Sequence, residues 1–257
     1  MIYNFNVENV KNDLIQWIKD WFEINGKGCN AVIGISGGKD STVVAALCVE
    51  ALGKDRVIGV SMPDKGQGLN DAPEICEYFG IRYIYAPIDK ITAAFDEFKD
   101  GDTSHLNEAK NHPWSFQAKQ NIPPRVRMTM LYAISQSNNG RVTNNCNMSE
   151  DWIGYSTRYG DSVGDFSPLC NLTVTEVRAI GHALGIPAKW VEKTPDDGLP
   201  GSSPDEVKFG FTYDLLDKYI RDGVEPENKQ IKDKIDAMHK KNLFKLRYMD
   251  CFEYKPE

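Results

Sequence analysis

The sequence predicts an α/β fold of three layers, with a doubly wound parallel sheet between two layers of helices. Three observations predict this fold. Short apolar runs rich in β-branched residues alternate with helical segments three times. The connections between these runs are long enough to hold helices, which parallel strands require. The runs are apolar throughout, as expected of strands covered on both faces. Right-handed crossovers then make the sheet doubly wound, and such sheets bind ligands beyond the carboxyl ends of their strands.

In the first half of the chain, glycine and proline residues separate the predicted elements. The first helix has one apolar face, which is formed by Val10, Leu14, Trp17, Ile18, Trp21 and Phe22. Gly26 ends this helix, Gly53 and Gly80 end the next two, and Pro63 stops the second strand. We therefore expect helices over residues 7–22, 42–52, 71–79 and 89–98, and strands over residues 29–35, 56–62 and 82–86.

The second half of the chain is less regular. Residues 100–113 are polar and predict a loop, whereas residues 193–204 contain three prolines and two glycines and predict an irregular loop or a mobile lid. Thr173 and Glu176 have the spacing of a capping box, which predicts the start of a helix. We expect a fourth strand over residues 141–143, and helices within 117–137 and over 149–155, 173–184, 212–220 and 228–240.

Composition limits the kind of protein. The 257 residues include 41% apolar and 26% charged side chains, and no shift in composition divides them, so we expect a single domain over residues 1–257. The net charge of −7 argues against nucleic acid or a membrane surface as a partner. No apolar run approaches the roughly 18 residues that span a bilayer, and the first residues do not resemble a signal peptide.

The cysteines indicate a reducing compartment. Six of them occur singly, at Cys29, Cys48, Cys76, Cys146, Cys170 and Cys251. Isolated cysteines without an export signal are typical of reduced thiols, so we expect a cytoplasmic protein. The absence of paired Cys or His spacings also argues against a structural zinc site.

The sharpest motif is GISGGKDS at residues 34–41, between a predicted strand and a predicted helix; we call it the glycine loop. Its glycines let the backbone turn tightly, and the start of the helix offers unpaired N–H groups to an anion. Ser36 and Ser41 add hydroxyl donors, and Lys39 adds a cation. Phosphate is the ligand that such a loop favours. Asp40 would repel bare phosphate, so it predicts a divalent cation that bridges the phosphates.

Two common nucleotide motifs do not match the glycine loop. A Walker A loop needs Ser or Thr directly after Gly-Lys, where this chain has Asp40, and a GxGxxG dinucleotide motif is absent. A glycine-rich turn without any ligand is the simplest alternative. The loop instead resembles the SGGxDS motif of the ATP-pyrophosphatase superfamily, which has a Rossmann-like sheet and cleaves ATP between its α and β phosphates. The loop alone leaves open NAD synthetase, GMP synthetase, tRNA-modifying ligases and argininosuccinate synthetase.

Further motifs resemble the NAD synthetase family. NCNMSEDWIGYSTRYGD at residues 145–161 is followed by GDFSPL at residues 164–169, and both are similar to segments of that family. NIPPRVRM at residues 121–128 and the pair His239-Lys240 match two more, in the same order. Each residue alone has a simpler explanation. For example, Glu150 suits the first turn of any helix, and His239 could be a surface histidine. The joint order of the motifs favours the family.

The resemblance implies roles for individual residues. ATP is bound by Gly34, Ile35, Ser36, Gly37, Gly38, Lys39, Asp40 and Ser41, with Asn145 and Asp196 at outer positions. Asp40 and Glu150 ligate Mg²⁺. Nicotinic acid adenine dinucleotide (deamido-NAD) is bound by Arg125, Arg158, Asp165, His239 and Lys240. Asp40, Lys39 and Asp165 are the candidate catalytic residues.

Four positions depart from the family pattern. Asn145 replaces a threonine, Val174 replaces a lysine, and Asp196 replaces a serine or threonine. Pro124 replaces an alanine, which we place in the first turn of a helix, where proline is tolerated. These departures affect the outer ATP contacts and leave the glycine loop intact.

The reaction that the resemblance implies is ATP-dependent amidation of deamido-NAD to NAD with ammonia. It passes through an adenylate and releases AMP and pyrophosphate. We expect free ammonia as the donor, because the chain has no room for a glutaminase domain before its first strand. Family members are homodimers, so a homodimer is expected here. The alternatives are a tRNA-modifying ligase, which would need a basic surface, and a sensor or flavoprotein-like module that binds a nucleotide without catalysis and would not need both Asp40 and Glu150.

Overall fold

The computed structural model describes all residues except 1–3, 66–70, 101–113, 195–203, 248 and 256–257. Its centre is a sheet of four parallel strands in the order β3-β2-β1-β4. The strands are β1 (Asn30–Gly34), β2 (Val57–Ser61), β3 (Arg82–Tyr85) and β4 (Gly140–Val142). Ala31 of β1 pairs with Val57 on one side and with Arg141 on the other, so β1 is central. All four strands lie within one residue of the predicted bounds.

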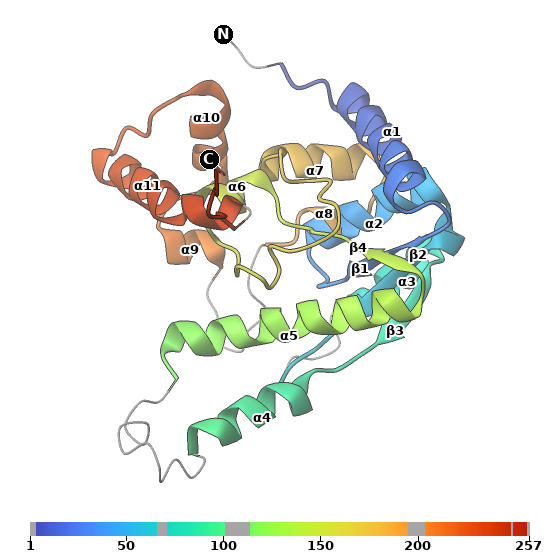
Figure 1. Ribbon diagram of the computed structural model, residues 1–257. Coiled ribbons are helices and arrows are strands. Elements are labelled where there is room, and N and C mark those ends of the chain that lie inside the picture. The colour runs from blue at the N-terminus through green and yellow to red at the C-terminus, as the bar shows by residue number, and fades with distance from the viewer. Residues whose placement is uncertain (1–3, 66–70, 101–113, 195–203, 248, 256–257) are drawn as a thin grey trace.

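Helices cover both faces of the sheet (Figure 1). One layer contains α1 (Val7–Asn25), α2 (Lys39–Leu52), α3 (Ala72–Phe79), α7 (Val174–Ala183) and α8 (Ala188–Val191), and the other contains α4 (Asp89–Asp100) and α5 (Phe116–Ser137). Alternate residues of a strand point to opposite faces. Accordingly, Ala31 and Ile33 pack into the core beneath α2, whereas Val32 packs on the side of α5. The predicted three-layer, doubly wound fold is confirmed.

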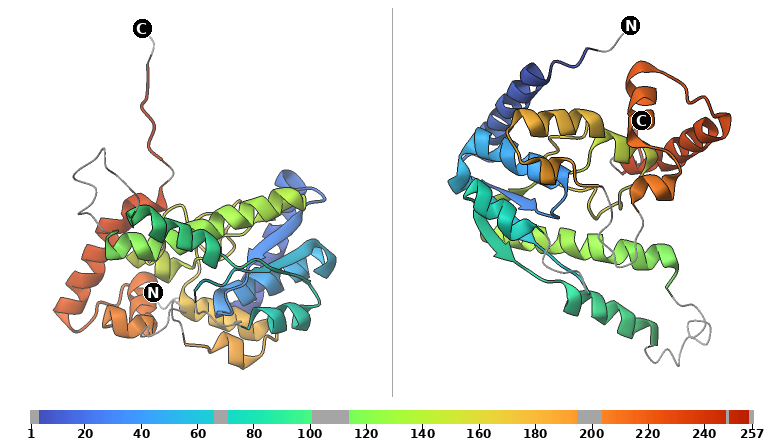
Figure 2. Two further views of the ribbon diagram at one scale, coloured as in Figure 1. Left: turned by 90° about the horizontal axis from the view of Figure 1, so that it is seen from below. Right: turned by 180° about the vertical axis from the view of Figure 1, so that it is seen from behind.

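A group of four helices lies beyond the carboxyl ends of the strands (Figures 1 and 2). We call it the helical cap: α6 (Met148–Ile153), α9 (Asp205–Phe209), α10 (Tyr213–Asp222) and α11 (Lys229–Asn242). The cap has its own apolar cluster, which includes Ile153, Phe209, Tyr213 and Leu216. Two 3₁₀ turns, η1 (Lys54–Arg56) and η3 (Leu243–Leu246), complete the assigned elements. The cap therefore faces the end of the sheet where the glycine loop emerges.

The prediction for Pro124 is wrong. Helix α5 begins at Phe116, because the side chain of Ser115 accepts a hydrogen bond from the Ala118 N–H, so Pro123 and Pro124 lie inside the helix. Prolines at these positions leave two carbonyls of the preceding turn without their helical donors. Pro124 instead packs against Gly160, where an added Cβ would lie 2.9 Å from the Pro124 Cβ.

Two smaller differences from the predicted elements concern helix ends. Helix α2 begins at Lys39, three residues earlier than expected, because Gly38 serves as its N-cap residue. The short helices α8 and α9 were not predicted, since four or five residues carry too little periodicity.

Most of the predicted loops over 100–113 and 193–204 lie outside the described residues. Within the described residues, no helix has the length and apolar character that crossing a bilayer requires.

Candidate active site

The glycine loop connects β1 to α2 at the carboxyl end of the sheet. Gly37 has φ of +82°, a conformation in which a side chain would be strained. The Ser36 hydroxyl accepts a hydrogen bond from the Gly38 N–H (3.2 Å) and lies 3.2 Å from the Ser41 hydroxyl. The Thr42 hydroxyl donates to the Gly38 carbonyl (2.8 Å). These bonds hold an open turn whose N–H groups stand at the start of a long helix, as a phosphate site requires.

Asp40 lies where this helix meets the helical cap. Its Oδ1 accepts a hydrogen bond from the Asn147 amide (3.1 Å), and its Oδ2 accepts one from the Lys39 ammonium (2.8 Å). Asn147 is also the N-cap of α6, because its side chain accepts a hydrogen bond from the Glu150 N–H (3.1 Å). One asparagine therefore fixes both Asp40 and the helix that carries Glu150.

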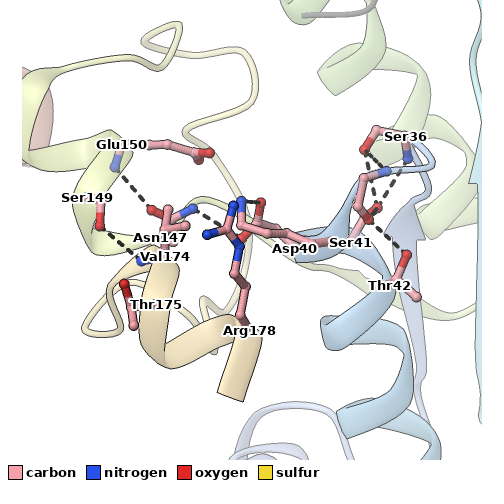
Figure 3. A network of polar contacts seen from close by, with 12 residues as sticks. Ser36, Asp40, Ser41, Thr42, Asn147, Ser149, Glu150, Val174, Thr175 and Arg178 are labelled. Atoms are coloured by element: carbon pink, nitrogen blue, oxygen red, sulfur yellow. Dashed lines mark hydrogen bonds and ion pairs between the residues drawn. The ribbon is translucent and has the colours of Figure 1, made fainter. Parts of the chain in front are cut away.

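Glu150 faces the same space as Asp40 (Figure 3). Burial, followed by the negative charge of Asp40, raises the pKa of Glu150 to about 8. Two carboxylates in one pocket repel each other, and a divalent cation between them would relieve that repulsion. The two carboxylates could together hold a cation. Their spacing in the sequence does not reveal this, because Asp40 and Glu150 are 110 residues apart.

Lys39 is buried, with 3% of its surface exposed. Its ammonium pairs with Asp40 and lies 5.9 Å from the centre of the Tyr213 ring. Burial lowers the pKa of Lys39, but the charges of Asp40 and Glu150 raise it more, so the net shift is upward. Lys39 therefore stays a cation at the head of α2.

The two carboxylates suit a magnesium ion that substrate helps to hold. The described residues contain no cluster of three or more His, Cys, Asp or Glu side chains arranged for a metal. Mg²⁺ commonly takes one or two carboxylates, with phosphate oxygens and water completing its shell. Asp40 and Glu150 fit that pattern, and they do not fit a resident metal bound by protein alone.

Asn145, which was predicted as an outer ATP contact, lies beside the glycine loop. Its amide donates to the Gly34 carbonyl (3.1 Å), and its Oδ1 accepts a hydrogen bond from the Thr143 hydroxyl (2.8 Å). Val174 is fully buried in the apolar cluster of the cap, so its side chain packs with the protein interior. Asp196 lies outside the described residues.

Arg125 and Arg158 are brought together from α5 and from the turn that follows α6. The Arg125 Nε donates to the Arg158 carbonyl (3.3 Å). The Arg158 guanidinium lies 5.0 Å from the Tyr159 ring centre and 5.2 Å from the Phe244 ring centre. Tyr159 has a φ of +61°, an uncommon value for a residue other than glycine. Arg125 of α5 and Arg158 of the turn therefore lie side by side, with the strained backbone at the next residue, Tyr159; we call the pair and this turn the arginine turn.

Asp165 lies at the open edge of β4. Its Oδ2 accepts a hydrogen bond from the Val142 N–H (2.7 Å), and its Oδ1 accepts one from the Tyr132 hydroxyl (3.3 Å). Burial and then the Asp165 charge raise the pKa of Tyr132 to about 12, so Tyr132 remains a donor. The carboxylate is thus fixed in orientation.

His239 lies apart from the glycine loop, on the far side of α6. Its ring stacks on Trp152, with 3.9 Å between ring centres, and its Nδ1 lies 2.9 Å from the Trp152 carbonyl. Lys240 is exposed. The structure therefore places the predicted residues in four places: the glycine loop with Glu150, the arginine turn, Asp165 at the edge of β4, and the outer face of α6 with α11.

Sequence reasoning missed Asn147, Tyr132 and Lys193. An Asn three residues before Glu150 is a helix N-cap signal that was available in the sequence. Tyr132 carried no such signal. The Lys193 ammonium donates to the Gly37 carbonyl (3.1 Å) and pairs with Asp71 (2.9 Å) across more than 100 residues. Such a contact between distant segments cannot be read from a single sequence.

Comparison with known proteins decides the family. A family profile described as NAD synthase matches residues 10–255 of the chain. The chain belongs to the NAD synthase family. The NH₃-dependent NAD⁺ synthetase of Finegoldia magna is 36% identical over 252 residues, which cover 97% of this chain and 98% of that protein. The family predicted from the motifs is confirmed.

Two solved structures of this family's fold resemble the chain over nearly its whole length. NMN synthetase from Francisella tularensis has a TM-score of 0.83 and 27% identity, with 98% of this chain and 100% of that chain covered. The NH₃-dependent NAD synthetase from Campylobacter jejuni has a TM-score of 0.75 and 25% identity, with 97% and 100% covered. The fold predicted from the strand–helix pattern therefore agrees with its structural neighbours.

Proposed function

We propose that the chain catalyses the ATP-dependent amidation of deamido-NAD to NAD, with free ammonia as the nitrogen donor. The observation that carries the proposal is the meeting of Asp40 and Glu150 beside the glycine loop, in a chain of the NAD synthase family. A nucleotide sensor would have no use for this carboxylate pair. The acidic net charge of −7 also disfavours a ligase that acts on tRNA.

The reaction has two steps. An oxygen of the nicotinate carboxylate attacks the α-phosphorus of ATP, the bond to the bridging oxygen breaks, and pyrophosphate leaves. The lone pair of ammonia then attacks the carbonyl carbon of the adenylate, a proton is lost, and AMP leaves with the electrons of the C–O bond. A carboxylate alone would expel a very poor leaving group, whereas AMP is a good one.

The glycine loop and Lys39 bring the two anionic substrates together. Backbone N–H groups of the loop and the dipole of α2 stabilise phosphate, and the buried Lys39 adds a full charge. Asp40 and Glu150 are the side chains that would hold Mg²⁺, which would supply further neutralisation of the triphosphate. Positioning and electrostatics provide most of the rate in such transfers.

The arginine turn and the edge of β4 form the acceptor site in this proposal. Arg125 and Arg158 offer positive charge to the phosphates of the dinucleotide, and Asp165 orients the acceptor next to the loop. His239 with Trp152, and the exposed Lys240, bind the outer part of the dinucleotide. Asp196 belongs to the ATP site by resemblance only.

A second acceptor is nicotinic acid mononucleotide, which amidation would convert to NMN. The resemblance to the Francisella NMN synthetase, with a TM-score of 0.83, is the observation that favours it. Both acceptors carry the same nicotinate carboxylate, so the glycine loop would act identically on either. They differ in whether an adenosine half must be bound.

We also propose that residues 1–257 act as one synthetase domain and as a homodimer in the cytoplasm. The C-terminal segment supports self-association, because it stands away from the body and exposes Phe252 (91%) and Tyr254 (75%) (Figure 2). Exposed aromatic side chains of this kind commonly mark an interface.

One assay tests the function. Purified protein is incubated with Mg-ATP and each acceptor in turn, with ammonium or with glutamine, and NAD, NMN, AMP and pyrophosphate are measured. We expect NAD from deamido-NAD and ammonium, with one AMP per NAD. If NMN forms faster than NAD, nicotinic acid mononucleotide is the preferred acceptor and deamido-NAD is not. Product formed with glutamine alone, or no product with either acceptor, would refute the proposal.

A further inference from the structure

Arg178 on α7 is a cation at the ATP site that neither the motifs nor the proposed roles include. Figure 3 shows its guanidinium extending from α7 towards Asp40 and Asn147. Its Nε is buried without a hydrogen-bond partner among the described residues, and the Oε2 of Glu192 lies 4.0 Å away. A buried charged N–H group is costly unless an acceptor reaches it. The Nε N–H therefore lacks an acceptor at hydrogen-bond distance, although it forms a long ion pair with Glu192, and an anionic ligand would supply that acceptor.

The charge balance of the site shows why a second cation is needed. Lys39 faces two carboxylates, Asp40 and Glu150, so without Arg178 these groups carry net negative charge once Glu150 ionises. Besides burial and those two carboxylates, the charge of Arg178 acts on the pKa of Lys39, which it lowers. The two cations thus share one electrostatic environment, although they come from α2 and α7.

The neighbouring residues of α7 do not supply this charge. Val174, one turn earlier on the same helix face, is fully buried in the cap and uncharged. Lys193 lies at the glycine loop, but it is already paired with Asp71. Arg178 is the cation that α7 presents to the site.

The position of Arg178 indicates which part of ATP it contacts. Helix α7 lies in the layer on one face of the sheet, whereas α5, which carries Arg125 and Tyr132, lies on the other (Figure 1). In phosphoryl transfer the attacking and leaving oxygens are roughly in line across the phosphorus. An acceptor held on the α5 side therefore drives pyrophosphate out towards α7.

We propose that Arg178 binds the pyrophosphate portion of ATP and the pyrophosphate product. This inference rests on the proposed function. When the bond between the α-phosphorus and the bridging oxygen breaks, its electron pair adds negative charge to the leaving pyrophosphate, and the guanidinium stabilises that charge. A planar guanidinium donates two parallel hydrogen bonds to phosphate oxygens, which a lysine ammonium cannot do.

The test compares Arg178→Gln and Arg178→Lys with the wild type in calorimetric titrations with Mg-pyrophosphate and with AMP. Lys218→Gln on α10 is the matched control, because it removes one exposed positive charge away from the site. We expect Arg178→Gln to weaken pyrophosphate binding by about 10- to 100-fold and to leave AMP binding within twofold. Arg178→Lys should recover part of the loss, and Lys218→Gln should match the wild type.

Unchanged pyrophosphate affinity in Arg178→Gln would overturn the proposal, and so would an equal loss of AMP affinity. AMP binding in the same preparation shows that the variant is folded. The titrations do not depend on the acceptor or on turnover. If the wild type fails to make NAD but Arg178→Gln still loses pyrophosphate selectively, the proposed function fails and the role of Arg178 stands.

Discussion

At the scale of single residues, Asn147 and Lys39 fix the position of Asp40 at the site. Asn147 caps α6 and binds Asp40, and Lys39 balances Asp40 at the head of α2. Glu150 is the exception, because burial and the charge of Asp40 raise its pKa more than the charge of Lys39 lowers it. The protein without ligand therefore stores an electrostatic cost at the place where a cation is to bind.

Glu150→Gln is expected to stabilise the metal-free protein while it removes activity. The pKa of Glu150 is raised from 4.5 to about 8, so the native state holds more protons than the unfolded state across that interval. Stability then falls as pH rises from about 4.5 to 8. We expect Glu150→Gln to melt several degrees higher than wild type at pH 8 without Mg²⁺, and to differ little at pH 4.5.

The same variant is expected to lose turnover by on the order of 100-fold, because a cation at the triphosphate loses one ligand. Added Mg-ATP should stabilise the wild type more than Glu150→Gln at pH 8. Thermal melts across pH, with and without Mg-ATP, provide the measurement. A variant that melts lower than wild type at pH 8 without metal would show that Glu150 has a stabilising partner instead.

The thiol of Cys146 is expected to be unreactive although it lies next to the site. Burial, followed by the charges of Asp161 and Asp151, raises the pKa of Cys146 well above its usual range, and thiolate is the reactive form. Cys251 is exposed, and all six cysteines are free. Titration of the native protein with Ellman's reagent should show one fast thiol, and Cys251→Ser should remove it. A fast phase that survives in Cys251→Ser would contradict this account.

At the scale of elements, Asp217 of α10 joins the first turns of α6 and α7. Its carboxylate is buried (5% exposed), and it accepts hydrogen bonds from the Ser149 hydroxyl (2.5 Å), the Thr175 N–H (2.8 Å) and the Thr175 hydroxyl (2.6 Å). The Ser149 hydroxyl in turn accepts one from the Val174 N–H (3.0 Å). The helices that carry Glu150 and Arg178 are therefore fixed by one side chain from the cap.

Asp217→Asn is expected to destabilise the fold and weaken metal binding together. The amide turns one acceptor into a donor that faces other donors, which costs about 1–3 kcal/mol. Loss of the support behind a metal ligand typically weakens metal affinity by about tenfold or more. Urea melts and Mg²⁺ titration of turnover measure the two effects. Asp214→Asn, at an exposed position on the same helix, should show neither effect. Equal changes in stability and Mg²⁺ requirement in the two variants would exclude the role of Asp217 in fixing α6 and α7.

The elements also show how far a single sequence predicts this protein. The four strands and the long helices could be predicted from the apolar periodicity and from the Gly and Pro residues that end them. The glycine loop could be predicted from its unusual mixture of Ser, Lys and Asp. Pro124 was misplaced because the N-cap Ser115 starts α5 earlier than its apolar pattern does. Tyr132, Asp217 and Arg178 were missed, since their contacts join segments far apart in sequence, and such contacts depend on tertiary packing.

At the scale of the whole molecule, the sheet and the helical cap bring the parts of the proposed site to one end of the sheet. The glycine loop follows β1 at its carboxyl end, Arg125 comes from α5, and Glu150 comes from α6 of the cap, which lies at the same end of the sheet (Figure 1). This arrangement puts the chemistry at the switch point of the doubly wound sheet, between β1 and β4.

Removal of residues 248–257 is expected to convert a dimer into a monomer. Met249, Phe252 and Tyr254 expose more than half of their surface in the described chain, which favours their burial in a second copy. Light scattering should give about twice the chain mass of 28.9 kDa for the full chain, and a monomer for the truncated one. A full chain that scatters as a monomer would refute the dimer, and a truncated chain that stays dimeric would place the interface elsewhere.

The most direct test of the central claim is the magnesium dependence of NAD formation in Asp40→Asn. The substitution keeps a hydrogen-bond acceptor for Asn147 but removes the charge that, with Glu150, holds the cation in the proposed function. We predict that turnover falls by about 100-fold or more at saturating substrates, and that the remaining activity requires higher Mg²⁺ than in wild type. Wild-type turnover with an unchanged magnesium requirement would contradict the account.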